Sequence, residues 1–177
     1  MIDLFLPLVI GLGLGIEPDH TGRSETTDTT APQVADATPT GSGDDLDASR
    51  VPEPQVPTGK FTTAVEVRPI LGMTKGNWVA VREFNGQDLV YFTHLMGWRC
   101  GLWDIRFGIN GAPAETVVAM EPCYDDMASP NVMQDVENYL PYIAFPPGSV
   151  DNIYVEIVYD DGTGDFARFD RAEVQIP

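Results

Sequence analysis

Aromatic side chains are confined to one part of this chain of 177 residues, and this limits where a folded core can form. Residues 60–177 hold 16 of the 17 aromatic residues, whereas residues 17–59 hold none. Aromatic side chains bury large apolar areas and dominate the energetics of protein cores. We therefore expect a folded domain over residues 60–177, a length that is ample for an independent core.

Residues 17–59 have the composition of a disordered linker. They contain 6 Pro and 4 Gly, and their 9 acidic residues outnumber the two basic ones, Arg23 and Arg50. A segment with so little to bury cannot offset the entropy lost on ordering its backbone, about 1–2 kcal/mol per residue. The sequence therefore predicts an acidic, Pro- and Thr-rich spacer, extended by like-charge repulsion and by its Pro-rich end at residues 51–57.

The N-terminus carries an uncharged apolar run over residues 4–16. A membrane-spanning helix needs about 20 apolar residues, whereas a run of about 7–15 is typical of a signal peptide. Asp3 in place of a basic residue, and the lack of a small-x-small cleavage site before Glu17, depart from a standard signal. We predict an export signal or weak membrane anchor over residues 1–16. The alternatives are a frayed apolar terminus or a start codon assigned at the wrong Met.

Alternation of apolar and polar residues predicts that residues 60–177 are built from strands. In residues 101–110, Ile105 and Phe107 share one face while Asp104 and Arg106 share the other. Similar patterns predict further strands over residues 61–71, 78–84, 89–98, 115–120, 152–159, 165–169 and 172–176.

Turn signals separate these strands. Asn85-Gly86 suits a two-residue hairpin loop, because both residues accept positive φ angles. Seven or eight short strands with frequent turns indicate an all-β fold, an antiparallel β-sandwich of immunoglobulin-like or jelly-roll-like type. Residues 125–142 do not alternate, and we predict a crossover with one short helix there.

Cys100 and Cys123 are the only two cysteines. If the chain is exported to an oxidising compartment, a disulfide between them is the expected state. Two reduced core cysteines are the main alternative, and a catalytic thiol would need a lowered pKa and a nearby base.

Polar residues that could carry chemistry are few. His94 is the single histidine of the predicted domain and a candidate general base, but its predicted strand places it on an apolar face, where a hydrogen-bonded core histidine is more common. Asp160, Asp161 and Asp165 surround a Gly turn and are calcium candidates, because hard cations prefer carboxylate oxygens. A plain hairpin turn explains them equally well. We expect no catalytic residue, no resident metal and no cofactor.

Four aromatic residues are candidates for a ligand-binding face: Trp78, Tyr139, Tyr142 and Phe145. Aromatic residues are enriched at recognition surfaces, although they also fill the cores of sandwich folds.

The formal net charge of −17 argues against partners that are themselves anionic. Nucleic acids and anionic membrane surfaces both require a basic surface, so neither is expected. The order of apolar run, spacer and strand-rich domain predicts an exported binding or structural module of the cell envelope. We expect it to be non-enzymatic, periplasmic or extracellular, with a protein or glycan partner and an N-terminus that serves as an export signal or as a membrane anchor. The alternatives are a Ca²⁺-dependent carbohydrate-binding domain, a hydrolase using Asp or His94, and a subunit whose sheet edge pairs with a partner strand.

Overall fold

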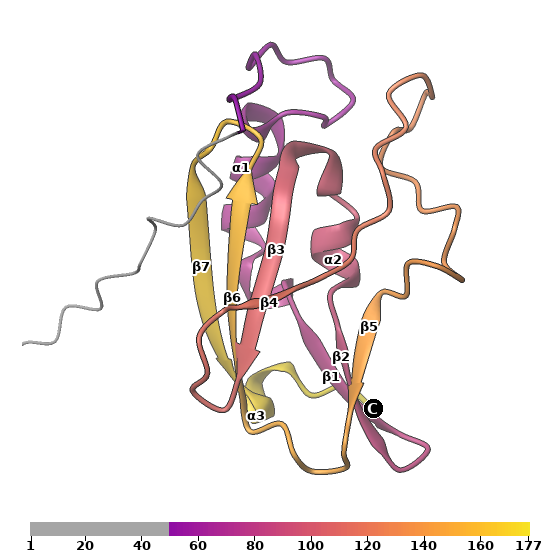
Figure 1. Cartoon of the computed structure of the whole chain (residues 1–177), viewed down its shortest axis with the longest axis vertical. Coiled ribbons are helices and arrows are strands. Elements are labelled where there is room, and N and C mark those ends of the chain that lie inside the picture. The colour runs from indigo at the N-terminus through magenta and orange to yellow at the C-terminus, as the bar shows by residue number, and fades with distance from the viewer. Residues whose placement is uncertain (1–49) are drawn as a thin grey trace, which may run out of the picture. The chain divides into compact units, whose positions relative to one another are not determined.

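The computed structural model describes residues 50–177; the predicted signal or anchor and most of the predicted spacer lie outside the described residues. Strands make up most of the secondary structure (Figure 1): β1 (Ala80–Phe84), β2 (Gln87–Tyr91), β3 (Leu102–Ile109), β4 (Thr116–Val117), β5 (Tyr142–Phe145), β6 (Asn152–Tyr159) and β7 (Gly164–Asp170). The helices are α1 (Ala64–Met73), α2 (Thr93–Met96) and α3 (Arg171–Val174), with 3-10 turns η2 (Lys75–Asn77) and η3 (Arg99–Gly101).

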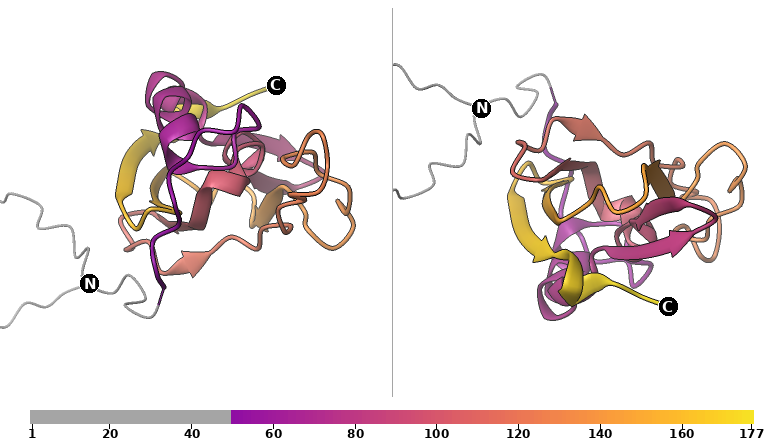
Figure 2. Two further views of the ribbon diagram at one scale, coloured as in Figure 1. Left: turned by 90° about the horizontal axis from the view of Figure 1, so that it is seen from above. Right: turned by 90° about the horizontal axis from the view of Figure 1, so that it is seen from below.

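The strands form two antiparallel sheets. One has three strands in the order β1-β2-β5, and the other has four in the order β4-β3-β6-β7. Seen from above in Figure 2, α1 and β4 lie at opposite sides of the domain. The prediction of a chain that is mostly strands in antiparallel sheets is confirmed, whereas the immunoglobulin-like or jelly-roll-like type stays a prediction.

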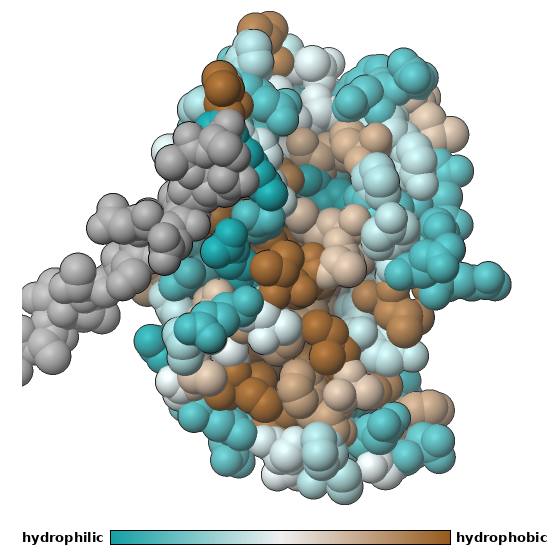
Figure 3. Space-filling model, in the orientation of Figure 1, coloured by the Kyte–Doolittle hydropathy of each residue, from teal (hydrophilic) through white to brown (hydrophobic). Residues whose placement is uncertain are grey.

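A single core joins the two sheets. Alternate residues of β6 are buried in it, as the period of two in a strand requires. The ring of Phe107 on β3 lies 4.9 Å from that of Phe92 and 6.2 Å from that of Phe145 on β5, so this side chain bridges the sheets. On the face shown in Figure 3, apolar residues gather in the centre and hydrophilic residues surround them.

The predicted hairpin at Asn85-Gly86 is confirmed. The two residues have φ angles of 49° and 74°, and they connect β1 to β2 directly after the Phe84–Gln87 pair. Both angles lie in the left-handed region that two-residue hairpin loops require.

The predicted strand over residues 61–71 is wrong, because α1 occupies most of it. Ala64, Val67 and Leu71 are all buried, and their spacing follows one face of a helix. The carboxylate of Glu66 accepts hydrogen bonds from the hydroxyl of Thr63 and from backbone N–H groups in residues 58–62. These bonds fix the start of the helix.

Three further secondary-structure predictions are wrong. The strand predicted over residues 89–98 stops at Tyr91, and α2 follows, so His94 is helical. The helix predicted within residues 125–142 is not formed; that stretch is irregular and ends at β5. The last predicted strand is instead α3, which begins with a capping box between Asp170 and Glu173.

The last residues of the predicted spacer, which extends to residue 59, make specific hydrogen bonds to the folded domain. The N–H of Glu53 donates to the carbonyl of Asp160 at 2.9 Å. The side-chain amide of Gln55 donates to the Asp160 carboxylate at 2.8 Å, and its oxygen accepts the N–H of Val65. Specific hydrogen bonds to the ends of β6 and α1 therefore order this segment without a large apolar contribution.

The open edge of β7 is contacted by the chain after α1. Nζ of Lys75 donates to the carbonyl of Phe166 at 3.0 Å and to the carboxylate of Asp165 at 2.6 Å. Phe166 and Asp165 both belong to β7, so this lysine ties η2 to the edge of the four-stranded sheet.

Candidate functional site

The connection from β4 to β5, residues 118–141, contains no helix or strand. We call it the β4–β5 loop. Irregular connections longer than about 12–15 residues are uncommon in compact domains and are often functional. The contacts that hold the β4–β5 loop in one conformation therefore define the candidate site.

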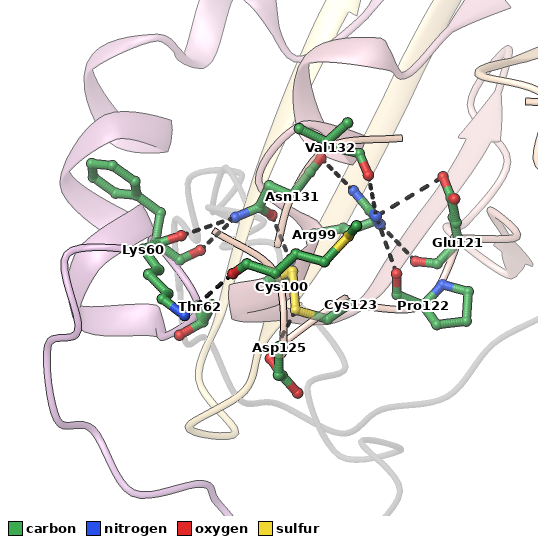
Figure 4. The surroundings of a disulfide bond; sticks show 12 residues. Lys60, Thr62, Arg99, Cys100, Glu121, Pro122, Cys123, Asp125, Asn131 and Val132 are labelled. Atoms are coloured by element: carbon green, nitrogen blue, oxygen red, sulfur yellow. Dashed lines mark hydrogen bonds and ion pairs between the residues drawn. A yellow bond between two sulfur atoms is a disulfide. The ribbon is translucent and has the colours of Figure 1, made fainter. Parts of the chain in front are cut away.

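A pair of cysteines closes the loop against the rest of the domain (Figure 4). Cys100 of η3 and Cys123 of the loop are 23 positions apart, and their sulfur atoms are bonded at 2.15 Å with a Cα–Cα distance of 5.1 Å. That separation lies within the usual range for disulfides. The predicted pairing is therefore compatible with the positions of both residues.

Arg99, next to Cys100, also holds the β4–β5 loop in place. It is only 3 % exposed, and its guanidinium nitrogens donate five hydrogen bonds to backbone carbonyls (Figure 4). Nε donates to Glu121 and the terminal nitrogens donate to the carbonyls of Met96, Pro122, Asn131 and Val132. A guanidinium carries five N–H donors, so its whole capacity is spent on holding the chain.

Glu121 balances the buried charge of Arg99 across 3.9 Å. It is 1 % exposed, and its carboxylate accepts hydrogen bonds from the hydroxyl of Tyr124 and from the N–H groups of Gln134 and Asp135. Burial alone would raise the pKa of Glu121, but these hydrogen bonds outweigh it and hold the pKa below its ordinary value. A buried carboxylate with so many donors stays ionised and acts as a structural anchor.

Asn131 connects three segments of the chain. Its side-chain oxygen accepts the N–H of Cys100 at 3.0 Å, and its amide donates to the carbonyl of Phe61 at 2.8 Å. Its own carbonyl accepts a hydrogen bond from Arg99 at 2.6 Å. One side chain thus fixes the turn before α1, the 3-10 turn η3 and the β4–β5 loop relative to one another.

Two pockets open between these three segments. The first, which we call the acidic pocket, has a volume of about 480 Å³ and includes Glu53, Asp125, Thr62 and the two cysteines in its lining. The second, which we call the aromatic groove, has a volume of about 390 Å³ and is lined by Phe61, Trp98, Pro130, Val132 and other residues.

The backbone of Phe61 is held in an unfavourable conformation at the aromatic groove. Its φ angle is 59°, in the left-handed region where a bulky side chain is rare. The ring is 40 % exposed and meets the ring of Trp98 edge to face at 5.3 Å. Such strain persists only where the surroundings fix it, and it is concentrated at functional sites.

Of the four aromatic residues predicted as candidates for a ligand face, Trp78 is not accessible at the surface. It is completely buried, and its indole N–H donates to the carbonyl of Leu71, so it belongs to the core. Tyr139, Tyr142 and Phe145 are half-buried on the loop and β5, with the ring of Tyr142 5.3 Å from that of Tyr91. Their role in ligand binding stays a prediction.

His94 has a structural environment. Its Nε2 lies 2.7 Å from the hydroxyl of Thr74, which itself donates to the carbonyl of Ile70. Because the single hydroxyl proton is already used, Nε2 of His94 carries the proton and donates it. Burial lowers the pKa of His94. The neutral ring therefore fastens α2 to the end of α1.

The three calcium candidates point to different partners. Asp160 is 1 % exposed and accepts hydrogen bonds from Gln55 and from the N–H of Ala64, while burial raises its pKa. Asp161 pairs with Arg68, and Asp165 pairs with Lys75. Within residues 50–177, no group of three or more His, Cys, Asp or Glu side chains is arranged to hold a metal ion.

No pattern in the sequence singles out Arg99, Glu121 and Asn131, whose contacts organise this end of the domain. The position of Arg99 beside a cysteine was visible, but four of its five partner carbonyls lie more than twenty residues away in a segment without periodicity. No local pattern predicts such contacts.

In the part of the chain that the structure describes, no helix is long and apolar enough to cross a membrane. Comparisons of the sequence with protein-family models, with curated proteins and of the structure with solved structures each find no match.

Proposed function

We propose that the chain is an exported, non-enzymatic binding module of the cell envelope, with a β-sandwich domain that binds its partner at the end formed by the β4–β5 loop. The observation that carries this proposal is the fixed conformation of that loop. A disulfide-compatible pair, the buried Arg99 and Asn131 all hold it in place. Rigid scaffolds that present irregular loops are a common design of binding proteins, because a preformed surface loses little entropy on binding.

The cysteine pair supports export. Disulfides persist in oxidising compartments and are rare where thiols are kept reduced. The periplasm or the extracellular space is therefore the proposed location.

The roles of the polar residues favour binding over catalysis. Nε2 of His94 is hydrogen-bonded to Thr74, and the carboxylate of Glu121 accepts hydrogen bonds from three donors. Groups held in this way stabilise the fold and are poorly suited to exchange protons with a substrate.

Two measurements test the proposal in the native cells. The first is fractionation of the full-length protein combined with thiol alkylation, using Cys123→Ser as the marker for one free thiol. We expect an exported protein that is alkylated only after reduction. A cytosolic protein with two freely reactive thiols would overturn the proposed location.

The second measurement is photo-crosslinking from a single introduced site. A photoreactive residue at Val132, which is 52 % exposed in the aromatic groove, should give a discrete adduct. The same residue at Ile176, which is 44 % exposed and lines neither pocket, is the control. Equal labelling at both positions, or none at Val132, contradicts a binding surface at this end.

A further inference from the structure

We propose that the acidic pocket and the aromatic groove form one composite site for a cationic segment of a partner protein. An apolar side chain of the partner enters the aromatic groove, and a neighbouring Lys or Arg enters the acidic pocket. This inference rests on the proposed binding function and specifies the chemistry of the partner.

The two pockets are lined by different residues of the same three segments. Both are bounded by the turn before α1, by the chain around η3 and by the β4–β5 loop. Phe61 lines the groove while Thr62 lines the acidic pocket, and Trp98 lines the groove while Cys100 lines the acidic pocket. Neighbouring residues of one segment thus line different pockets, so the two pockets follow one another along these segments, and a partner segment that crosses both can place one side chain in each.

The aromatic groove provides an apolar anchor point. Phe61 and Val132 expose 40 % and 52 % of their surfaces in its lining, and the ring of Trp98 supports that of Phe61. Exposed apolar side chains that lie next to one another, as these do, are typical of surfaces that bind a partner. The cation in the lining, Lys60, donates to the carbonyl of Met127 at 3.2 Å.

The acidic pocket favours a cation over an anion. Glu53 and Asp125 both line it, and both belong to exposed parts of the chain. Arg99 is the one basic residue in the described lining, and its five N–H donors already bind backbone carbonyls. It has no donor left with which to bind a carboxylate or phosphate.

The surrounding sequence extends this negative field. No Lys, Arg or His occurs between Arg106 and Arg168, whereas 11 Asp and Glu residues do. Four of these acids, Asp125, Asp126, Asp135 and Glu137, lie on the β4–β5 loop outside its buried anchor Glu121. A predominantly negative field steers cationic ligands toward the surface and opposes anionic ones. A basic protein segment is therefore favoured over a glycan, which carries no compensating positive charge.

Selection from a library of phage-displayed random peptides on the full-length, oxidised protein tests this inference. We expect enriched peptides that carry Lys or Arg beside an aromatic or aliphatic residue. Their affinity should weaken when NaCl rises from about 0.05 M to about 0.5 M, since salt screens exposed charges.

Matched variants then locate the site. Asp125→Asn and Val132→Ser should each weaken binding of an enriched peptide at least about threefold, the size expected for a partly exposed contact. Asp151→Asn removes the same charge, and Ile176→Ser a comparable aliphatic group, from residues that line neither pocket; both should leave the affinity unchanged. Far-ultraviolet circular dichroism of each variant confirms that the fold is retained.

Enriched peptides that are neutral or acidic, equal effects of the site and control variants, or no enrichment at all would each overturn the inference. A glycan that binds at the groove in place of a basic peptide would also overturn it. The crosslink from Val132 and the exported, oxidised state are read independently, so the inference can fail while the proposed function stands.

Discussion

The four-stranded sheet and the β4–β5 loop are held together by different forces, although they belong to one domain. In the sheet, a repeated pattern of apolar residues on β3 and β6 buries side chains in a common core. In the loop, a cysteine pair, Arg99 and Asn131 each make specific contacts that no neighbouring residue repeats. The sheet is therefore robust to single changes at its surface, whereas the loop depends on a few residues.

Because of this difference, we expect the β4–β5 loop to unfold locally while the sheet stays folded. Hydrophobic burial is spread over many contacts and is lost cooperatively, whereas polar clamps give local structure that can open alone. Four variants test how far the two regions are independent.

Phe107→Ala should have the largest effect, because it removes the ring that bridges the sheets through Phe92 and Phe145. Phe107 is 2 % exposed, and truncation of a buried Phe costs about 3–5 kcal/mol. Urea denaturation measures the loss. Phe84→Ala is the control, since Phe84 is 55 % exposed, and a similar loss for both variants would refute the role of the bridge.

Arg99→Met should destabilise the loop by about 3 kcal/mol, since it leaves Glu121 as a buried charge without its partner and several carbonyls without donors. Hydrogen exchange followed by mass spectrometry should show faster exchange in residues 121–135 than in β6. Arg82→Met, on the surface of β1, is the control. A uniform increase across all strands would mean that the loop and the sheet unfold as one unit.

The double variant Cys100→Ser/Cys123→Ser should cost about 1–3 kcal/mol. The loss of chain entropy on closing a loop of this length accounts for the upper end of that range. The loss should be smaller because Arg99 and Asn131 still join the same segments when the sulfur atoms are absent. Reduction of the wild-type protein should reproduce the change in melting temperature. A domain that fails to fold without the disulfide would show that the polar contacts depend on it.

The pH dependence of Asp160 should give the smallest effect. Its pKa is raised above the ordinary value of 3.8 by burial, so the folded state binds the proton more tightly than the unfolded state does. Its contribution to stability is present below pH 3.8 and is lost as the pH rises through the folded pKa. Relative to Asp160→Asn, the wild-type protein should gain thermal stability on acidification from neutral pH toward pH 4.

The pKa of Asp88 is shifted in the opposite direction to that of Asp160, and this sets the lowest pH at which the experiment can be interpreted. Hydrogen bonds from Arg171 hold its pKa well below the ordinary value of 3.8, so its stabilisation is lost only as the pH falls further. A constant difference between wild type and Asp160→Asn across the range would contradict the shift at Asp160.

The sequence predicted the parts of the fold that are governed by local periodicity. β3 and β6 alternate regularly, and both were recognised; the Asn85-Gly86 hairpin follows from two residues that accept positive φ. At α1 two periods compete, because Val65 and Val67 suggest alternation while Ala64, Val67 and Leu71 follow a helix. The Thr63-x-x-Glu66 spacing, which is that of a capping box, was the signal for a helix start, and in the structure the hydroxyl of Thr63 donates to the carboxylate of Glu66.

The candidate site was less predictable for a physical reason. A disulfide between Cys100 and Cys123 could be predicted because they are the only two cysteines. The contacts of Arg99 and Asn131 could not, because they join segments about thirty residues apart. Such polar contacts depend on the finished tertiary structure. The strain at Phe61 is likewise imposed by its surroundings, since nothing about a phenylalanine predicts a positive φ.

The boundaries of the sheets have a consequence for the behaviour of this protein at high concentration. Exposed strand edges are templates on which further chains polymerise. Here β4 is two residues long, β1 is covered by the C-terminal residues, and β5 is flanked by Pro141 and Pro146. Lys75 occupies the remaining edge at β7. A charged lysine at a strand edge disfavours pairing with a further chain, and we therefore expect chemical neutralisation of Lys75 to increase the tendency of the protein to associate.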